Sequence, residues 1–113
     1  MMRWLAALLL LFLLAATPAL GSSRRQRGQA VFDAAGCLHC HTINGVGGHK
    51  GPDLSSIGKT VKKAAIHRQI VHGSTGMPPF GKVLGGKEIN DLVAYLRSCR
   101  SKPANEYRES AAR

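Results

Sequence analysis

The 113-residue chain has few acidic residues, few aromatic residues and little that could form a β-sheet. Six Asp and Glu stand against 16 Lys and Arg, and Phe, Trp and Tyr together make up 5% of the residues. No stretch shows the alternation of apolar and polar residues that is typical of half-buried strands. The pattern therefore predicts an all-α chain and disfavours folds built on a βαβ unit.

Cysteine is also scarce, with three in the chain. Cys37 and Cys40 have the spacing of a dithiol redox site, but that kind of site needs strands around it. A structural zinc site would need a second Cys or His pair, whereas Cys99 stands alone. Both interpretations are disfavoured.

No apolar run reaches the ~20 residues that a membrane-spanning helix needs. Residues 1–21 instead have the pattern of a signal peptide, with Arg3 before the apolar run 4–16 and small residues at Ala19 and Gly21. An uncleaved N-terminal anchor is the alternative. We expect cleavage before Ser22 and export to the periplasm or another space outside the cytoplasm.

Residues 22–113 hold 15 of the Lys and Arg and all six acidic residues, which gives a net charge of +9. Ninety-two residues form one small domain with a marginal core, because a short chain buries only about 60% of its surface. A large buried prosthetic group would supply the missing core. The positive charge either keeps the protein soluble or attracts acidic partners.

The segment Cys37-Leu38-His39-Cys40-His41 is such a prosthetic-group site. Two thiols three residues apart can bond to the two vinyl groups of a haem, and the histidine that follows can bind its iron. This is the c-type haem attachment motif. We expect one covalent haem c.

Helical spacing of apolar residues predicts three helices around this motif. A basic arm, residues 22–27, precedes a first helix that Gly36 ends in a left-handed conformation. Gly28 on that helix either allows another helix to approach closely or is merely tolerated. Glycines make residues 42–53 an irregular loop, in which His49 is solvated.

The second predicted helix covers residues 60–72 and ends at Gly73. His67 and His72 are expected on its polar face. Its core positions are Val61, Ala64, Ile66 and Ile70.

The third covers residues 87–101, with Lys87 paired to Asp91 across one turn. Cys99 on its apolar face is either a small buried hydrophobe or a reactive thiol. Residues 102–113 form a polar tail.

Met77 lies in the loop 74–80 and is the sole methionine after residue 21. Pro78 restricts Met77 to an extended backbone that can aim the thioether inward, and a thioether is a soft ligand for haem iron. A core methionine that fills a gap is the alternative interpretation. His49, His67 and His72 are chemically able to replace Met77 as ligand.

Several stretches resemble class I cytochrome c, in particular the small bacterial mono-haem type. The resemblance spans residues 28–99 and implies that type's fold, in which three to four helices and loops wrap around one covalent haem. The stretches are residues 28–32, 37–41, 51–54, 76–80 and 91–96.

The resemblance also implies the roles of site residues. Cys37 and Cys40 would carry the thioether bonds, and His41 and Met77 would be the two iron ligands. The carbonyl of Pro52 would accept the other ring N–H of His41.

By the same resemblance, Leu54 would press on the haem, and Gly28 and Phe32 would cross the last helix at Leu92, Tyr95 and Leu96. Some family members place a tryptophan near a haem propionate. Here Trp4 lies in the predicted signal peptide, so that feature is missing.

Iron with two protein ligands has no open position for substrate, so the expected function is one-electron transfer in an exported respiratory or dehydrogenase-linked chain, and not enzymatic catalysis. The alternatives are a fixed haem subunit of a larger oxidoreductase, and a gas-binding or peroxidatic protein with an open position. Expected partners are acidic redox proteins such as an oxidase or dehydrogenase, not nucleic acid. Lys59, Lys62, Lys63 and Lys82 are the candidate docking residues. Membrane contact is expected only with an uncleaved N-terminal segment.

Overall fold

The computed structural model describes residues 21–102. The predicted signal peptide, apart from Gly21, and the predicted tail, apart from Lys102, lie outside the described residues. None of the helices within residues 21–102 is both long and apolar enough to span a bilayer.

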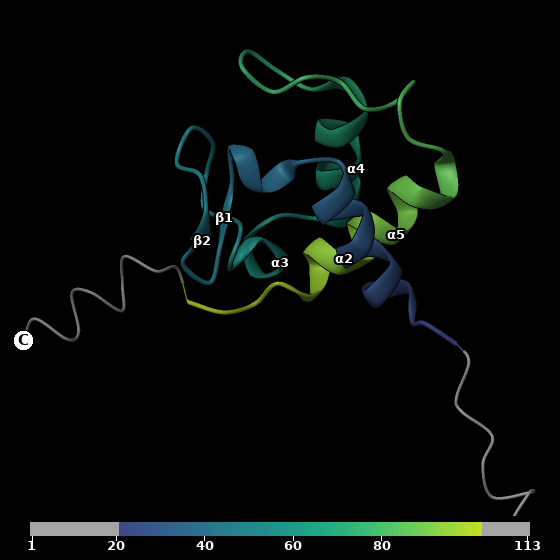
Figure 1. Cartoon of the computed structure of the whole chain (residues 1–113), viewed down its shortest axis with the longest axis horizontal. Helices are drawn as coiled ribbons and strands as arrows, with labels where there is room; N and C mark the ends of the chain where they lie inside the picture. The colour runs from purple at the N-terminus through teal and green to yellow at the C-terminus, as the bar shows by residue number, and fades with distance from the viewer. Residues whose placement is uncertain (1–20, 103–113) are drawn as a thin grey trace, which may run out of the picture.

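The described chain is all-α apart from one short strand pair, as predicted (Figure 1). Helix α2 crosses α5, α4 packs beside α5, and the β1–β2 hairpin lies at the left of the view in Figure 1. The elements, in chain order, are α2 (Arg24–Ala34), the 3₁₀ turn η1 (Cys37–His39), β1 (Thr42–Ile43), β2 (Val46–Gly47), α3 (Ile57–Thr60), α4 (Lys63–His72) and α5 (Gly86–Ser98).

Helix α2 begins at Arg24, so the predicted basic arm is wrong for residues 24–27, which form the first turn. Ser23 and Gln26 cap the helix reciprocally: Ser23 N donates to Gln26 Oε1 at 2.8 Å, and Gln26 N donates to Ser23 Oγ at 3.1 Å. The three arginines favour a solvated arm in the sequence, but the Ser23–Gln26 capping pair makes the backbone helical from Arg24 onward. Gly36 follows the helix with φ 77°, which confirms the predicted left-handed conformation.

The predicted helix 60–72 begins three residues later, at Lys63 of α4, because Val61 and Lys62 are extended; Thr60 is instead the last residue of a separate short helix, α3. Helix α4 then buries Ile66 and Ile70 as expected. Ala64 is exposed, which corrects its predicted core position, and the half-buried alanine is Ala65.

The loop 42–53 is less irregular than expected, because Thr42 pairs with Gly47 and Ile43 with Val46 in antiparallel register. Asn44 and Gly45 form the turn, with φ 51° and 83°. Asn-Gly is the preferred pair for such a two-residue hairpin.

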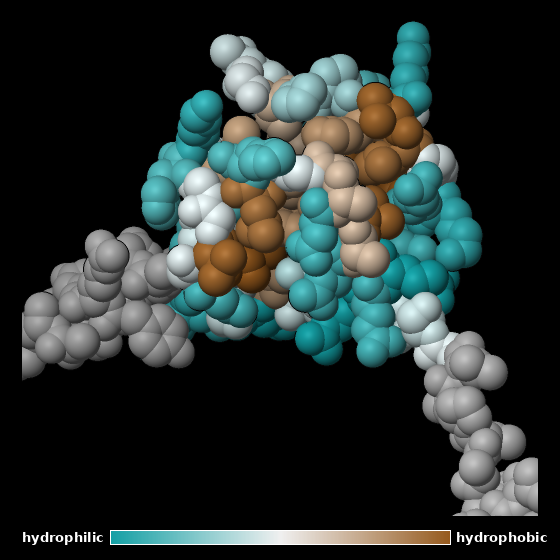
Figure 2. All heavy atoms as spheres, in the orientation of Figure 1, coloured by the Kyte–Doolittle hydropathy of each residue, from teal (hydrophilic) through white to brown (hydrophobic). Residues whose placement is uncertain are grey.

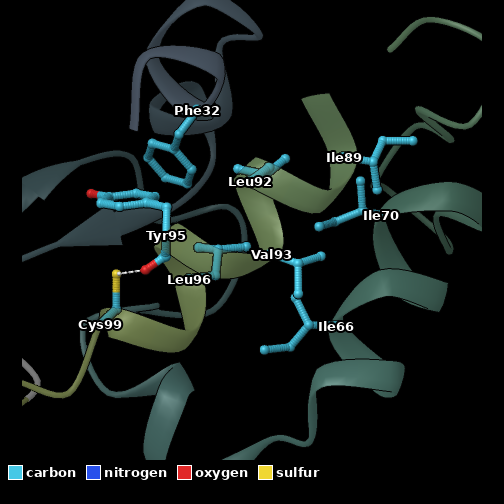
Figure 3. Packing of buried hydrophobic residues seen from close by; sticks show 9 residues of the cluster. All are labelled: Phe32, Ile66, Ile70, Ile89, Leu92, Val93, Tyr95, Leu96 and Cys99. Atoms are coloured by element: carbon cyan, nitrogen blue, oxygen red, sulfur yellow. Dashed lines mark hydrogen bonds between the residues drawn. The ribbon is translucent and has the colours of Figure 1, made fainter. Parts of the chain in front are cut away.

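Helix α5 ends at Ser98, three residues before the predicted end, and Cys99 is extended. Its apolar stripe forms the centre of the core (Figure 3). The Phe32 and Tyr95 rings meet edge to face at 5.4 Å between centroids, which joins α2 to α5. Nine buried residues make up the core: Phe32, Ile66, Ile70, Ile89, Leu92, Val93, Tyr95, Leu96 and Cys99.

Gly28 allows a close helix crossing, so the first of its two interpretations is confirmed. A Cβ built there would overlap the backbone carbonyl of Asp91 and lie 2.8 Å from Tyr95 Cβ. The crossing between α2 and α5 therefore requires glycine at this position.

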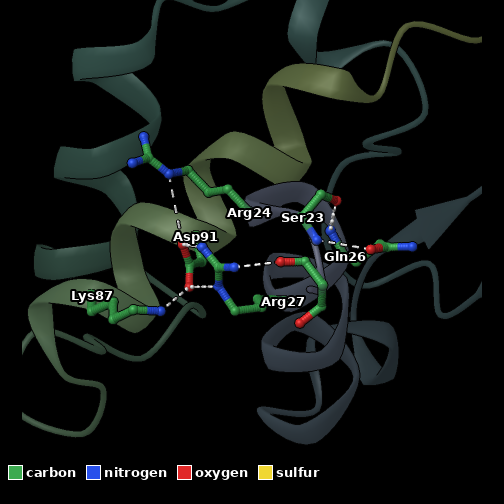
Figure 4. A network of polar contacts seen from close by, with 7 residues as sticks. Ser23, Arg24, Gln26, Arg27, Lys87 and Asp91 are labelled. Atoms are coloured by element: carbon green, nitrogen blue, oxygen red, sulfur yellow. Dashed lines mark hydrogen bonds and ion pairs between the residues drawn. The ribbon is translucent and has the colours of Figure 1, made fainter. Parts of the chain in front are cut away.

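The side chain of Asp91 on α5 also links the two helices at this crossing, through hydrogen bonds and ion pairs (Figure 4). Its carboxylate accepts from Arg27 Nε at 3.0 Å and from Lys87 Nζ at 3.1 Å, and Arg24 Nε lies 3.8 Å away. The Lys87 pair is the one predicted from spacing. The hydrogen bond from Arg27, with that from Lys87, holds the pKa of Asp91 below its ordinary value.

Candidate functional site

The central feature of the fold is a cavity of about 910 Å³. This is near the upper end of the range for small-molecule and cofactor sites. Its walls are mostly apolar and come from η1, α3, α4, the loop after α4 and α5. The space-filling view shows apolar residues across the middle of one face, with hydrophilic residues around much of its rim (Figure 2).

The attachment motif forms one wall of this cavity. Cys37, Cys40 and His41 all line it and are all half-buried. The turn η1 places the two cysteines one turn apart, with Cys40 N donating to the carbonyl of Cys37 at 3.2 Å. Burial raises the pKa of the Cys37 thiol. The wall therefore presents two thiols and an imidazole to one space large enough for a haem.

His41 is oriented by the loop that follows the hairpin. Its Nδ1 lies 2.8 Å from the carbonyl oxygen of Pro52, and since a carbonyl can only accept, Nδ1 carries the proton. Nε2 is then the ring nitrogen left for a metal. Gly51 makes room for the ring, because a Cβ at this residue would lie 2.7 Å from His41 Cε1.

Met77 lines the same cavity from the loop that joins α4 to α5. Ser74 and Met77 exchange two backbone hydrogen bonds of 3.0 Å, which close a tight turn around Gly76. Met77 is half-buried, and His49, His67 and His72 are exposed and absent from the cavity wall. The geometry therefore brings Met77, and none of these three histidines, to the cavity shared with His41.

One further residue, Gln69, bears on Met77 and was not singled out from the sequence. Gln69 Nε2 donates to Met77 Sδ at 3.3 Å and to Ser74 Oγ at 3.0 Å. Gln69 follows Ile66 by three residues and lines the cavity. That helical spacing from a core residue was a usable signal, because it places Gln69 beside the buried face of α4.

Leu54 lines the cavity, as its predicted haem contact requires. Cys99 is buried, with 8% of its surface exposed, and Sγ lies 3.5 Å from the carbonyl oxygen of Tyr95 (Figure 3). Burial raises the pKa of the Cys99 thiol. Its interpretation as a small buried residue is therefore confirmed.

Comparison with known proteins agrees with this geometry. Residues 23–96 match the family described as cytochrome C oxidase, cbb3-type, subunit III. Cytochrome c6 of Rippkaea orientalis is 30% identical over 110 residues, covering 85% of this chain and 92% of the relative. Cytochrome c6 of Aphanizomenon flos-aquae is 31% identical over 80 residues, covering 61% of this chain and 83% of the relative. No solved structure matches significantly.

The family match spans the region that forms the cavity, including the attachment motif and Met77. They agree with a cavity that offers two thiols and an imidazole at the spacing of covalent haem attachment. The chain belongs to the small class I mono-haem c-type cytochromes, carries one haem c bound through Cys37 and Cys40, and is an electron carrier.

Proposed function

We propose that His41 and Met77 would bind the haem iron and that the protein transfers single electrons without catalysing a reaction of its own. The observation that carries the proposal is that both side chains line one cavity. The Nδ1 of His41 is already bound to Pro52, which leaves Nε2 for iron. Haem supplies one-electron chemistry when bound, at a potential that methionine ligation raises relative to bis-histidine ligation.

The protein itself positions the two ligands and shields the haem site from water. The carbonyl of Pro52, in the loop after the hairpin, positions His41, and the Ser74–Met77 turn positions the thioether. The apolar walls exclude water, which limits rearrangement of the surroundings when the charge changes. With iron held by both His41 and Met77, no position would be open for a substrate, which suits an electron carrier.

Carbon monoxide tests this proposal on the unaltered protein. If Met77 is a ligand, the ferrous protein should show little spectral change under carbon monoxide at neutral pH. Rapid and complete binding would mean an open sixth position and would favour the gas-binding or peroxidatic alternative.

A second candidate function is a fixed subunit of a larger oxidoreductase, because the matching family is described as an oxidase subunit. Gel filtration of detergent extracts from the native source distinguishes the two. A free carrier elutes at the size of the monomer, whereas a subunit elutes with its complex.

We propose acidic redox proteins as partners, docked through Lys59, Lys62, Lys63 and Lys82, all of which are exposed. Lys82 precedes Val83, an exposed large hydrophobic residue that could add apolar contact area. Electron-transfer rates to the partner should fall as ionic strength rises, since salt screens charges within about 8 Å at physiological concentration. Rates that do not depend on salt would contradict this docking mode.

Export to the periplasm is proposed from the pattern of residues 1–21. The mature protein should begin near Ser22, which N-terminal sequencing can determine. A protein that retains Met1 and sediments with membranes would support the anchored alternative.

A further inference from the structure

We propose that residues 97–101, here called the C-terminal strap, position His41 by holding the loop that carries Pro52. The inference rests on the proposed role of His41 as an iron ligand. It assigns a role at the haem site to residues that do not line the cavity. The segment in question, residues 51–58, runs from the loop into the first two residues of α3 and is called the proximal loop below.

The first link is a pair of backbone hydrogen bonds between the strap and the proximal loop. Ser101 N donates to the carbonyl of Ser55 at 2.9 Å, and Gly58 N donates to the carbonyl of Cys99 at 2.9 Å. Ser55 is 1% exposed, so this part of the loop is buried. A Cβ at Gly58 would overlap the carbonyl of Arg97, which shows how closely the two segments approach.

The second link is a pair of arginines. Arg100 Nη1 donates to the carbonyl of Gly58 at 2.6 Å, and Arg97 Nη1 donates to the same oxygen at 3.2 Å and to the carbonyl of Val61 at 3.0 Å. Charge-assisted hydrogen bonds of this kind are about twice as strong as neutral ones. A helix of four residues such as α3 has little stability of its own. The arginines therefore hold α3 against the end of α5.

The third link runs from Ser55 back to Pro52. Asp53 Oδ1 accepts from Ser55 N at 2.8 Å and from Ser55 Oγ at 2.6 Å. Ser55 Oγ in turn accepts from Asn44 N at 2.8 Å. These bonds fix the turn that directly follows Pro52. Asp53 therefore connects a displacement of Ser55 to the residue next to the carbonyl that accepts from His41.

The inner edge of the proximal loop is held by the motif and by β1. Gly51 N donates to the carbonyl of Cys40 at 2.7 Å, and Leu54 N donates to that of Thr42 at 2.8 Å. The strap holds the outer edge. Loss of the strap should therefore lengthen the bond between His41 and Pro52 without detaching the loop.

The expected change in reduction potential has a defined direction. An N–H that donates to a carbonyl makes the imidazole a stronger donor to the metal, which favours the ferric state. A weaker hydrogen bond should therefore raise the reduction potential and speed hydrogen exchange at His41 Nδ1. Loss of positive charge alone should lower the reduction potential, because removing nearby cations makes the more positive ferric state more favourable.

The test uses the haem-loaded protein with the double variant Arg97→Ala/Arg100→Ala. The matched control is Lys59→Ala/Lys62→Ala, which removes two exposed cations near the same helix, α3, and none of the strap's hydrogen bonds. The measurements are the reduction potential and, by NMR of the ferrous protein, the exchange rate of the His41 ring N–H. We expect the arginine variant to raise the potential and speed exchange about tenfold or more, and the lysine variant to leave exchange unchanged and lower the potential.

If both variants lower the potential equally and exchange stays at the wild-type rate, the strap has only a stabilising role and the proposal is overturned. Should the double variant fail to bind haem, Arg100→Ala alone gives the same comparison while the hydrogen bonds of Arg97 remain in place. Rapid and complete binding of carbon monoxide to the ferrous wild-type protein would instead contradict the proposed function, so the two failures are distinguishable.

Discussion

The backbone of Gly28 lies against the carbonyl of Asp91, with no room for a side chain between them. Replacing Gly28 with Ala should push α2 away from α5 and destabilise the haem-loaded protein by about 1–3 kcal/mol, the usual cost of overpacking. Urea unfolding followed at the haem absorption band measures the change.

Gly86→Ala is the matched control for that substitution. Gly86 is the first residue of α5, and a Cβ there meets nothing within 4 Å. The change should be neutral or slightly stabilising, since Ala favours helix over Gly. Equal losses of stability in the two variants would mean that the close crossing is not the cause.

Asp91→Asn should lower stability at neutral pH and much less at acid pH. The folded protein holds the pKa of Asp91 below its unfolded value, so the ionised carboxylate contributes stability above about pH 4, and that contribution is lost as pH falls through the folded pKa. Unfolding by urea at pH 7 and pH 3 measures the difference.

Asp33→Asn, at an exposed residue of α2, is the control. It should change the unfolding midpoint little at either pH. If the difference in unfolding free energy between Asp91→Asn and wild type is the same at pH 7 and pH 3, ionisation of Asp91 is not what stabilises the crossing.

Thiol counting tests haem attachment and the burial of Cys99 together. With Cys37 and Cys40 bonded to haem, the folded protein should react with no aromatic disulfide reagent, because Cys99 is 8% exposed and burial raises the pKa of its thiol. In urea, one thiol per chain should react. Three reactive thiols would mean that the haem is not covalently bound.

The alkaline limit of stability follows from Tyr95. Burial, with a smaller effect from Cys99, raises its pKa to about 12. The unfolded chain loses this proton near pH 10, so the folded state should lose stability as pH rises from about 10 to 12. Tyr95→Phe, which keeps the ring contact with Phe32, should reduce that loss. If stability falls with pH in Tyr95→Phe as it does in wild type, ionisation of Tyr95 does not set the alkaline limit.

How far the sequence predicts the structure depends on whether the determining contacts are local. Cys37, Cys40 and His41 are fixed by spacing, and the buried face of α5 by its period, because both signals lie within a few residues. The break at Val61 and the strap contacts of Arg97 and Arg100 depend on residues about 40 positions apart, which no local pattern encodes.

Two wrong predictions, at the start of α2 and in the loop 42–53, had a local signal in the sequence that neighbouring residues obscured. Ser23 and Gln26 form the capping box of α2, but the surrounding arginines suggested a solvated arm. Asn44-Gly45 is a strong hairpin pair, but the glycines that follow suggested an irregular loop. The hydrogen bond from Gln69 to Met77 requires α4 and the following loop to fold back on each other, and that arrangement is tertiary.

The central claim is that Met77 would bind the haem iron together with His41. The most direct measurement is the ferric spectrum and reduction potential of Met77→Ala beside His49→Ala. The account predicts that Met77→Ala loses the weak sulfur-to-iron absorption near the red end of the spectrum, has a lower potential and binds carbon monoxide in the ferrous state, while His49→Ala matches wild type. An unchanged spectrum and potential in Met77→Ala, with both altered in His49→Ala, would contradict it.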